Sequence, residues 1–311
     1  MKKQFTVGPL LIIIAASLWA VDGVIRRSLF TLPPIIIVFY EHLIGAAIVA
    51  PFILSKLLKE KLSRREFILI AFVALLSGLF GTLWFTDALT RVNFIPFSVV
   101  FLLQKLQPIF AITTARLVLK EKIHRNYVKW ALLTMIAAFF VTFPNGQINF
   151  QTGQGTIMAA LLAVGAAFAW GSSTAFSKMS LLNKPNDVMT GMRFILTSIF
   201  ALVAIFILGK NSALFTPSLS QFARFLLIAV TTGMVAILIY YKGLKNTQVK
   251  VATILELVYP LLAVFIDMFL YKTYLAPTQY LAALVMLFGV YKISQSQNFS
   301  EVIDEVTLPS T

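Results

Sequence analysis

The chain has 311 residues, of which 59% are hydrophobic and only 12% are charged. A soluble domain carries about 25% charged residues, so this composition excludes a soluble globular protein and indicates one that is integral to a membrane. The net charge of +14 does not indicate nucleic-acid binding, because most lysines and arginines lie in short gaps between apolar stretches, where membrane topology places them.

Ten apolar stretches approach or exceed the length of about 20 residues that a helix needs to cross a bilayer. The gaps between them are too short to hold a soluble domain. A polar tail, residues 294–311, is predicted to lack regular structure. We therefore predict an all-α integral membrane protein with transmembrane helices at residues 8–26, 34–54, 67–89, 96–119, 127–143, 157–179, 188–208, 222–244, 249–271 and 278–293.

Basic residues are distributed unevenly between the two sets of gaps. Counted from the N-terminus, one set of alternate gaps holds 18 lysines and arginines and the other set holds six. Cytoplasmic loops of membrane proteins carry such an excess of Lys and Arg. We therefore predict a multi-pass protein of the plasma or inner membrane, with both termini and the polar tail in the cytoplasm.

The second half of the chain repeats features of the first half. The sequence around Trp19 resembles that around Trp170, and residues 78–89 resemble residues 233–244. Residues 1–145 and 154–293 are then two repeats of five spans each. Because five is an odd number, the second repeat enters the membrane from the opposite side and is inverted relative to the first. Two inverted five-helix repeats are typical of secondary transporters, whose substrate site lies at the repeat interface near the membrane midplane.

The fourth span of each half is a hydrophobic helix with a proline near its middle. Pro108 follows Gln104 by four residues, and Pro260 follows Glu256 by four residues. Proline has no N–H, so the carbonyl four residues earlier loses its partner and the helix opens there. A free carbonyl and a polar side chain at one depth must face protein or a water-filled cavity. A packing kink is the alternative for each copy, but the matching positions favour a cavity.

These features together resemble the drug/metabolite transporter (DMT) superfamily, specifically its EamA-like members. The resemblance covers about residues 8–293 and implies alternating-access transport of small metabolites without ATP hydrolysis. The family usually has a glutamate after the fourth helix of each half, and here Glu121 is present in the first half but Thr273 takes its place in the second. The motifs that carry the resemblance are the tryptophan-centred first helices, the pairs Ala88-Leu89 and Gly243-Leu244, and Pro108 with Lys120-Glu121-Lys122.

Charged residues inside the spans are the strongest candidates for a site, because each costs a few kcal/mol at the bilayer centre unless it faces water or a partner. Lys105 and Glu256 adjoin the two helix breaks, which favours a functional role. For Asp22 and Arg193, snorkelling or a structural ion pair is the favoured alternative. Glu41 and Arg193 correspond in the repeat, but inversion puts them at different depths, so we expect no direct ion pair between them.

Aromatic residues add to the predicted cavity, although packing or lipid contact is the default role of such residues. Tyr259 lies three residues after Glu256 and so shares its helix face. We predict a cavity lined by spans one, two, four, six, seven and nine. The candidate substrate-binding residues are Trp19, Glu41, Gln104, Lys105, Trp170, Arg193, Glu256 and Tyr259, with helix breaks at Pro108 and Pro260.

Signatures of an enzyme or a pump are absent from the sequence, which lacks Gly-x-Ser-x-Gly, His-Glu-x-x-His and a phosphate loop. With no cysteine and only His42 and His124, we expect no catalytic residues, no metal and no cofactor. The predicted function is secondary transport, as export or exchange, of a small organic metabolite such as an amino acid. A solute channel and a membrane-embedded enzyme are the alternatives. Glu256 is titratable and Gln104 is not, so proton coupling through one half is a further hypothesis.

Overall fold

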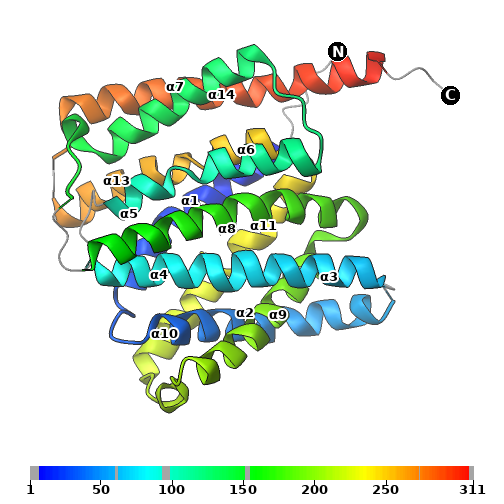
Figure 1. Ribbon diagram of the computed structural model, residues 1–311, viewed down its shortest axis with the longest axis vertical. Coiled ribbons are helices and arrows are strands. Elements are labelled where there is room, and N and C mark those ends of the chain that lie inside the picture. Colours follow the sequence, from blue (N-terminus) through cyan, green and yellow to red (C-terminus); the bar gives the residue numbers. More distant parts are fainter. Residues whose placement is uncertain (1–6, 60–61, 93–98, 151–154, 273, 308–311) are drawn as a thin grey trace.

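The structure is a computed structural model that describes residues 7–59, 62–92, 99–150, 155–272 and 274–307. In this part of the chain the regular structure is helical (Figure 1). The helices are α1 (Val7–Arg27), α2 (Pro34–Lys59), α3 (Arg64–Val73), the π-helix η1 (Ala74–Gly81), α4 (Thr82–Arg91), α5 (Val99–Gln104), α6 (Gln107–Val118), α7 (Arg125–Thr142), the short 3-10 turn η2 (Pro144–Gly146), α8 (Thr156–Asn183), α9 (Asn186–Ile207), the 3-10 turn η3 (Asn211–Phe215), α10 (Leu219–Val230), α11 (Met234–Lys245), α12 (Val249–Leu255), α13 (Val258–Tyr271) and α14 (Pro277–Thr307).

The predicted all-α membrane class is confirmed. Among the described residues, seven helical segments are long and apolar enough to cross a membrane by length and composition. Each predicted range coincides with one helix or with consecutive helices. Three of the ranges contain a break within the described residues, at α5–α6, α10–α11 and α12–α13. The third range of the first half, α3–η1–α4, is one continuous helix whose middle part is π-helical.

The C-terminal tail departs from the prediction, because α14 continues as a helix to Thr307. No glycine or proline lies between Lys292 and Thr307, and extending an existing helix is far cheaper than nucleating a new one. Residues 294–307 are therefore helical rather than irregular. Two of the predicted features lie outside the described residues. They are Thr273, which departs from the family pattern, and the start of the fourth predicted span at residues 96–98.

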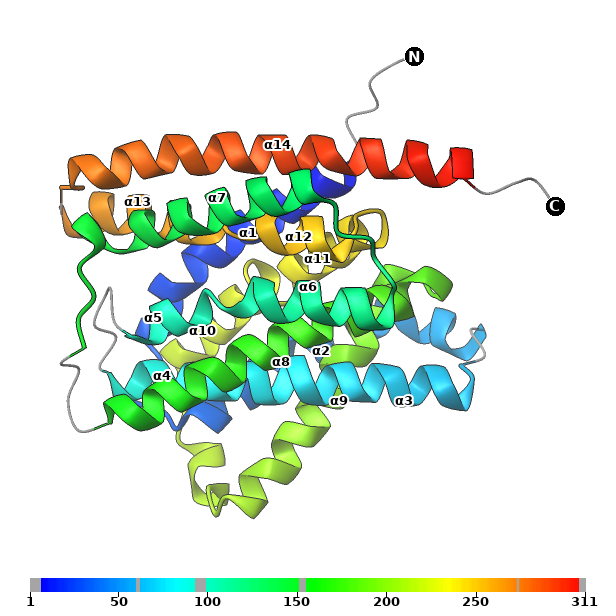
Figure 2. The same cartoon turned by 45° about the horizontal axis from the view of Figure 1, so that its top comes forward.

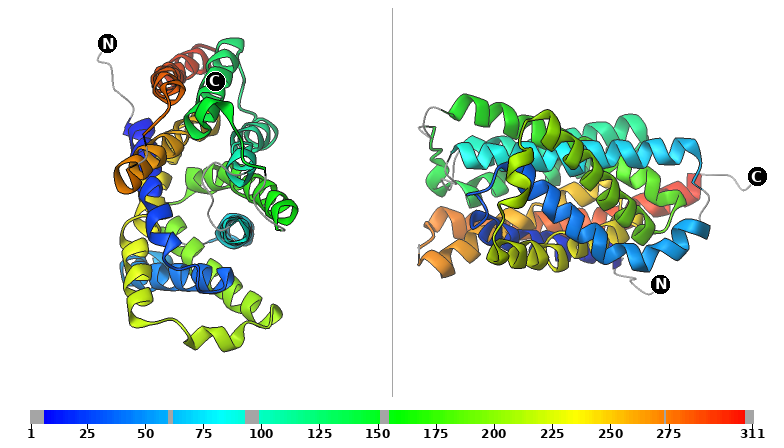
Figure 3. Two further views of the ribbon diagram at one scale, coloured as in Figure 1. Left: turned by 90° about the vertical axis from the view of Figure 1, so that its left-hand side faces the viewer. Right: turned by 90° about the horizontal axis from the view of Figure 1, so that it is seen from below.

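Helices from the two halves of the chain pack against one another throughout the structure. α1 packs against α11 and α13, α2 against α9, and α6 against α8 and α12. α7 and α14, which follow the two fourth ranges, lie side by side along one margin (Figures 1 and 2). The left view of Figure 3 looks nearly along α3 and α4. In this view, helices from both halves of the chain lie around the centre of the molecule. The centre is thus built from both halves.

The helix breaks follow from the two prolines. α5 ends at Gln104 and α6 begins at Gln107, with Pro108 in its first turn. α12 ends at Leu255 and α13 begins at Val258, with Pro260 in its first turn. Proline is tolerated in a first helical turn, where an N–H would lack a partner anyway. In each case the chain therefore ends one helix and starts another where a continuous helix would lose a hydrogen bond.

Two glycines let helices of opposite halves approach closely. A Cβ atom on Gly171 of α8 would lie 2.6 Å from the carbonyl oxygen of Gln107, at the α5–α6 break. A Cβ atom on Gly243 of α11 would lie 2.8 Å from the carbonyl oxygen of Gly8 in α1. Small residues of this kind allow backbone contact between membrane helices. Gly171 in particular brings α8 against the first helix break.

Candidate transport cavity

A cavity of about 270 Å³ lies at the centre, between the two halves. The structure brings all of the sequence-predicted residues to its lining, namely Trp19, Glu41, Gln104, Lys105, Pro108, Trp170, Arg193, Glu256, Tyr259 and Pro260. The third and eighth predicted spans, which we did not predict to line the cavity, also contribute to it. They add Ser77, Thr82 and Phe85 from η1 and α4, and Tyr240 and Tyr241 from α11.

A hydrogen-bonded chain of four side chains joins the two helix breaks, and we call it the helix-break cluster. Gln104 Nε2 donates to Gln107 Oε1 at 2.8 Å, and Gln107 Nε2 donates to Glu256 Oε2 at 3.0 Å. The hydroxyl of Tyr240 donates to Glu256 Oε1. Gln107 and Tyr240 were missing from the predicted set. Gln107 could have been found from its position one helical turn after Gln104 and directly before Pro108.

Lys105 lies in the turn between α5 and α6 and lines the cavity. Its ammonium group makes no hydrogen bond, ion pair or cation–π contact with any residue that the structure describes. In particular, it forms no ion pair with Glu256, whose carboxylate is held by Gln107 and Tyr240. A partly buried cation without a protein partner is costly inside a membrane protein unless water or a ligand solvates it.

Arg193 is buried and contacts neutral groups. Its Nη1 donates to the hydroxyl of Tyr241 at 2.9 Å and its Nη2 donates to Ser77 Oγ at 2.8 Å. The guanidinium also lies over the Tyr241 ring, 5.6 Å from the centroid. Its Nε has no partner among the described residues. Arg193 therefore lacks a carboxylate partner in this part of the chain, and Glu41 pairs with a different arginine.

That arginine is Arg26, at the centre of an ion cluster in the cavity lining. Arg26 Nε contacts Asp22 Oδ2 at 2.6 Å, and Nη2 contacts Glu41 Oε2 at 3.0 Å. The hydroxyl of Thr232 donates to Asp22 Oδ1 at 2.6 Å. Asp22 thus takes part in a structural ion pair, the alternative favoured for it from the sequence. The cluster ties α1 to α2 and to the turn before α11.

Replacing Arg26 by methionine should lower the stability of the protein by about 3 kcal/mol, because the buried carboxylate of Glu41 and the half-buried carboxylate of Asp22 would lose their shared cation. Unfolding in detergent by heat or denaturant measures this loss. Arg27→Met is the matched control, since Arg27 is partly exposed and lies 3.7 Å from Asp267. Its loss should cost about 1 kcal/mol or less. Equal destabilisation by the two variants would contradict a special role for the Arg26 cluster.

Aromatic rings form the walls of the cavity. The ring of Trp19 lies 5.2 Å from that of Tyr240, and the ring of Trp170 lies 5.1 Å from that of Phe85. Trp170 Nε1 donates to the carbonyl of Ser77 at 3.1 Å. Ser77 lies within the π-helix η1, and π-helical turns are frequent at functional positions.

A carboxylate outside the cavity lining also links the two halves of the chain. Glu121 accepts hydrogen bonds from the main-chain N–H groups of Val249 and Lys250, at 2.7 and 3.0 Å. The hydroxyl of Tyr127 donates to the carbonyl of Lys250 at 2.6 Å. These contacts fix the segment after α6 to the start of α12. The glutamate expected from the family resemblance thus joins the two halves.

Residues 6–143 and residues 157–295 each match the EamA-like transporter family. The chain is 35% identical over 291 residues to the riboflavin transporter ImpX of Fusobacterium nucleatum subsp. nucleatum, covering 93% of this chain and 97% of that protein. It is 28% identical over 243 residues to the uncharacterized transporter sll1164 of Synechocystis sp., covering 74% and 66% of the two chains. A solved crystal structure with 15% sequence identity superposes with a TM-score of 0.71 over 94% of this chain and 98% of that chain, a likeness of fold alone.

Proposed function

The chain belongs to the EamA-like transporter family, and from this premise we propose that it exports or exchanges a small organic metabolite through the central cavity by alternating access. The observation that carries the proposal is the helix-break cluster. It places polar groups from both halves at one point of the cavity, where rocking of the halves would separate or remake their contacts. Broken helices beside a cavity are the usual form of a transporter's binding site.

Our proposed architecture is ten membrane-spanning helices in two inverted repeats of five. It is supported by the two separate family matches, over residues 6–143 and 157–295. It is also supported by the helix break in the fourth range of each half, and by reciprocal packing such as α1 with α13 and α6 with α8.

For the orientation, we propose that both termini are cytoplasmic. The chain has no native cysteine, so single cysteines can be introduced without background labelling. A cysteine at Ser212, exposed in η3, should react with an impermeant thiol reagent added to intact cells. A cysteine at Asn183, exposed at the end of α8, should react only after the membrane is permeabilised. The reverse labelling pattern would contradict the orientation.

As substrate we propose a flavin, with riboflavin as the first compound to test. This proposal is supported by the relative named as a riboflavin transporter. It is also supported by the cavity, since Trp19, Trp170 and Tyr240 offer rings against which a planar isoalloxazine can stack. Lys105 and the amides of the helix-break cluster can donate hydrogen bonds to its carbonyl oxygens. An amino acid is the second candidate, favoured by the presence of cations and a carboxylate in one cavity.

The test is counterflow in proteoliposomes. Vesicles loaded with unlabelled riboflavin should take up external labelled riboflavin faster than empty vesicles, in a saturable manner. A channel would give flux without this stimulation, and a membrane enzyme would give no flux. Stimulation by amino acids and not by riboflavin would replace the flavin with the second candidate. The absence of counterflow for every small metabolite tried would overturn alternating-access transport.

A further inference from the structure

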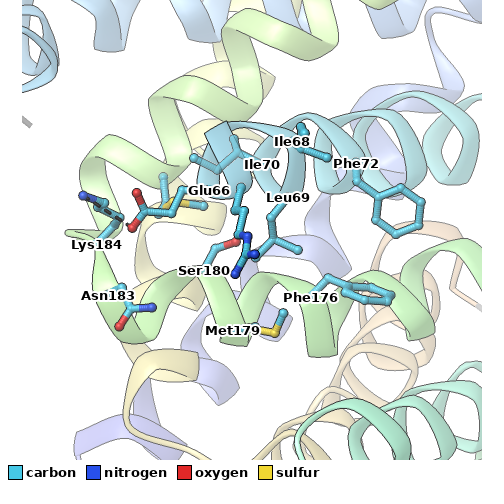
Figure 4. A pocket seen from close by; sticks show the side chains of 12 residues that line it. Glu66, Ile68, Leu69, Ile70, Phe72, Phe176, Met179, Ser180, Asn183 and Lys184 are labelled. Atoms are coloured by element: carbon cyan, nitrogen blue, oxygen red, sulfur yellow. Dashed lines mark ion pairs between the residues drawn. The ribbon is translucent and has the colours of Figure 1, made fainter. Parts of the chain in front are cut away.

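A second hollow lies on the surface of the protein, away from the central cavity. It has a volume of about 590 Å³ and runs between α3, α8 and the start of α9 (Figure 4). We call it the α3–α8 groove. Its lining residues are Arg65, Glu66, Ile68, Leu69, Ile70, Phe72, Phe176, Met179, Ser180, Asn183, Lys184 and Met189.

The groove is charged at one end and apolar at the other. Glu66 and Lys184 form an ion pair of 3.5 Å across the charged end. Phe72 and Phe176 meet at the other end, edge to face, with ring centroids 5.0 Å apart. Figure 4 shows these two pairs at opposite ends of the groove. Phe72 lies seven positions after Arg65 on α3, which is about 10 Å along a helix. The groove therefore matches a molecule with a polar head and an apolar tail.

The polar groups of the groove are not fully matched within the protein. Arg65 makes no hydrogen bond or ion pair with any described residue, and the only carboxylate in the lining, Glu66, is paired with Lys184. The hydroxyl of Ser180, a residue that is 5% exposed, also lacks a partner in the described part of the chain. Arg65 is exposed, so its guanidinium is available to a ligand that carries an anion. The buried hydroxyl of Ser180, at the wall of the same groove, suits a ligand with further polar oxygens.

The surface around the groove is apolar. On α3, Phe67, Ile68 and Phe72 are 44%, 55% and 42% exposed. In a membrane protein such a face meets lipid chains, so the ligand that reaches the groove most readily is a lipid. Cations at a membrane surface attract anionic lipids, each contributing about 1 kcal/mol. A zwitterionic lipid would add a cation of its own beside Arg65 and Lys184.

We propose that the α3–α8 groove binds one anionic phospholipid, with the phosphate at Arg65 and Lys184 and the upper part of an acyl chain reaching toward Phe72 and Phe176. α3 lies within the first family match, and α8 and α9 lie within the second. The lipid would therefore contact both halves of the transporter. Its binding is independent of the solute that the central cavity carries.

The first experiment compares lipids retained by the purified protein. Protein is extracted from vesicles of equal parts phosphatidylglycerol and phosphatidylcholine, and bound lipid is counted by native mass spectrometry. The parent should retain phosphatidylglycerol preferentially. Arg65→Gln should lower that preference roughly fivefold, which corresponds to the loss of one cation. Arg64→Gln is the matched control, since Arg64 is the exposed neighbour on α3 and does not line the groove.

The second experiment fills the groove. Ile68→Trp places a larger side chain in the lining and should abolish retention of phosphatidylglycerol, whereas Phe67→Trp, on the same helix outside the lining, should not. Three results would each overturn the proposal. They are equal retention of the two lipids by the parent, equal effects of the Arg64 and Arg65 substitutions, and undiminished phosphatidylglycerol binding by Ile68→Trp.

Discussion

The Glu256→Gln variant should lose uphill transport driven by a pH gradient while it keeps solute-for-solute exchange. Glu256 is the only residue of the helix-break cluster with a carboxylate. Its two carboxylate oxygens accept hydrogen bonds from Gln107 and Tyr240. The equivalent residue of the first half, Gln104, cannot bind or release a proton. If a proton gradient drives the transporter, the proton is therefore carried at one helix break only.

The substitution should leave the cluster hydrogen-bonded. In the parent, Gln107 donates a hydrogen bond to Glu256. A glutamine at position 256 would present its NH₂ group to Gln107 instead. The side-chain amides of Gln107 and Gln104 would then rotate by about 180°, which exchanges the positions of their oxygen and nitrogen atoms. Each can do so, because an amide offers both a donor and an acceptor. Gln107 would then accept from residue 256 and donate to Gln104. Tyr240 would still donate to the remaining oxygen. The variant thus removes a titratable group with little change in contacts.

Proteoliposomes with an imposed pH gradient measure the effect. The parent should concentrate labelled solute, and Glu256→Gln should only equilibrate it, with counterflow unchanged. Asp267→Asn is the control, since Asp267 is another carboxylate of the cavity lining but lies outside the helix-break cluster. Accumulation by Glu256→Gln equal to that of the parent would show that another group couples transport. A parent that never accumulates solute would contradict proton coupling itself.

The Lys105→Met variant should weaken substrate binding by roughly 10- to 100-fold, the loss expected for a hydrogen bond from a charged donor. Lys105 has no partner among the described residues, so its removal leaves no buried group of the protein unpaired. Methionine has a similar length and no charge. The fold should therefore persist while the solute loses a contact.

Two measurements test this expectation. The half-saturating solute concentration in counterflow should rise in Lys105→Met, and the thermal unfolding midpoint should stay at the value of the parent. Lys129→Met is the matched control, because Lys129 is exposed on α7, over the ring of Trp130, and does not line the cavity. An unchanged half-saturating concentration for Lys105→Met would return Lys105 to a role in packing or solvation.

The sequence predicted the features that depend on local rules. Apolar stretches and their flanking charges predicted helices close to the observed ranges. Pro108 and Pro260 predicted where two helices open, because a missing N–H acts on the residue four positions earlier in any fold. Repeated motifs then pointed to residues from distant parts of the chain that line one cavity.

The tertiary structure decided which polar groups meet, since that depends on how each helix is rotated and on which helix it packs against. Gln107 links Gln104 to Glu256 only because α6 packs against α12 with that face turned inward. Arg26 is buried in the last turn of α1 and pairs with Glu41 across a helix interface. Apolar periodicity is weak in helices that are hydrophobic on every side, so the sequence alone leaves their rotation undetermined, and only the packed structure fixes it.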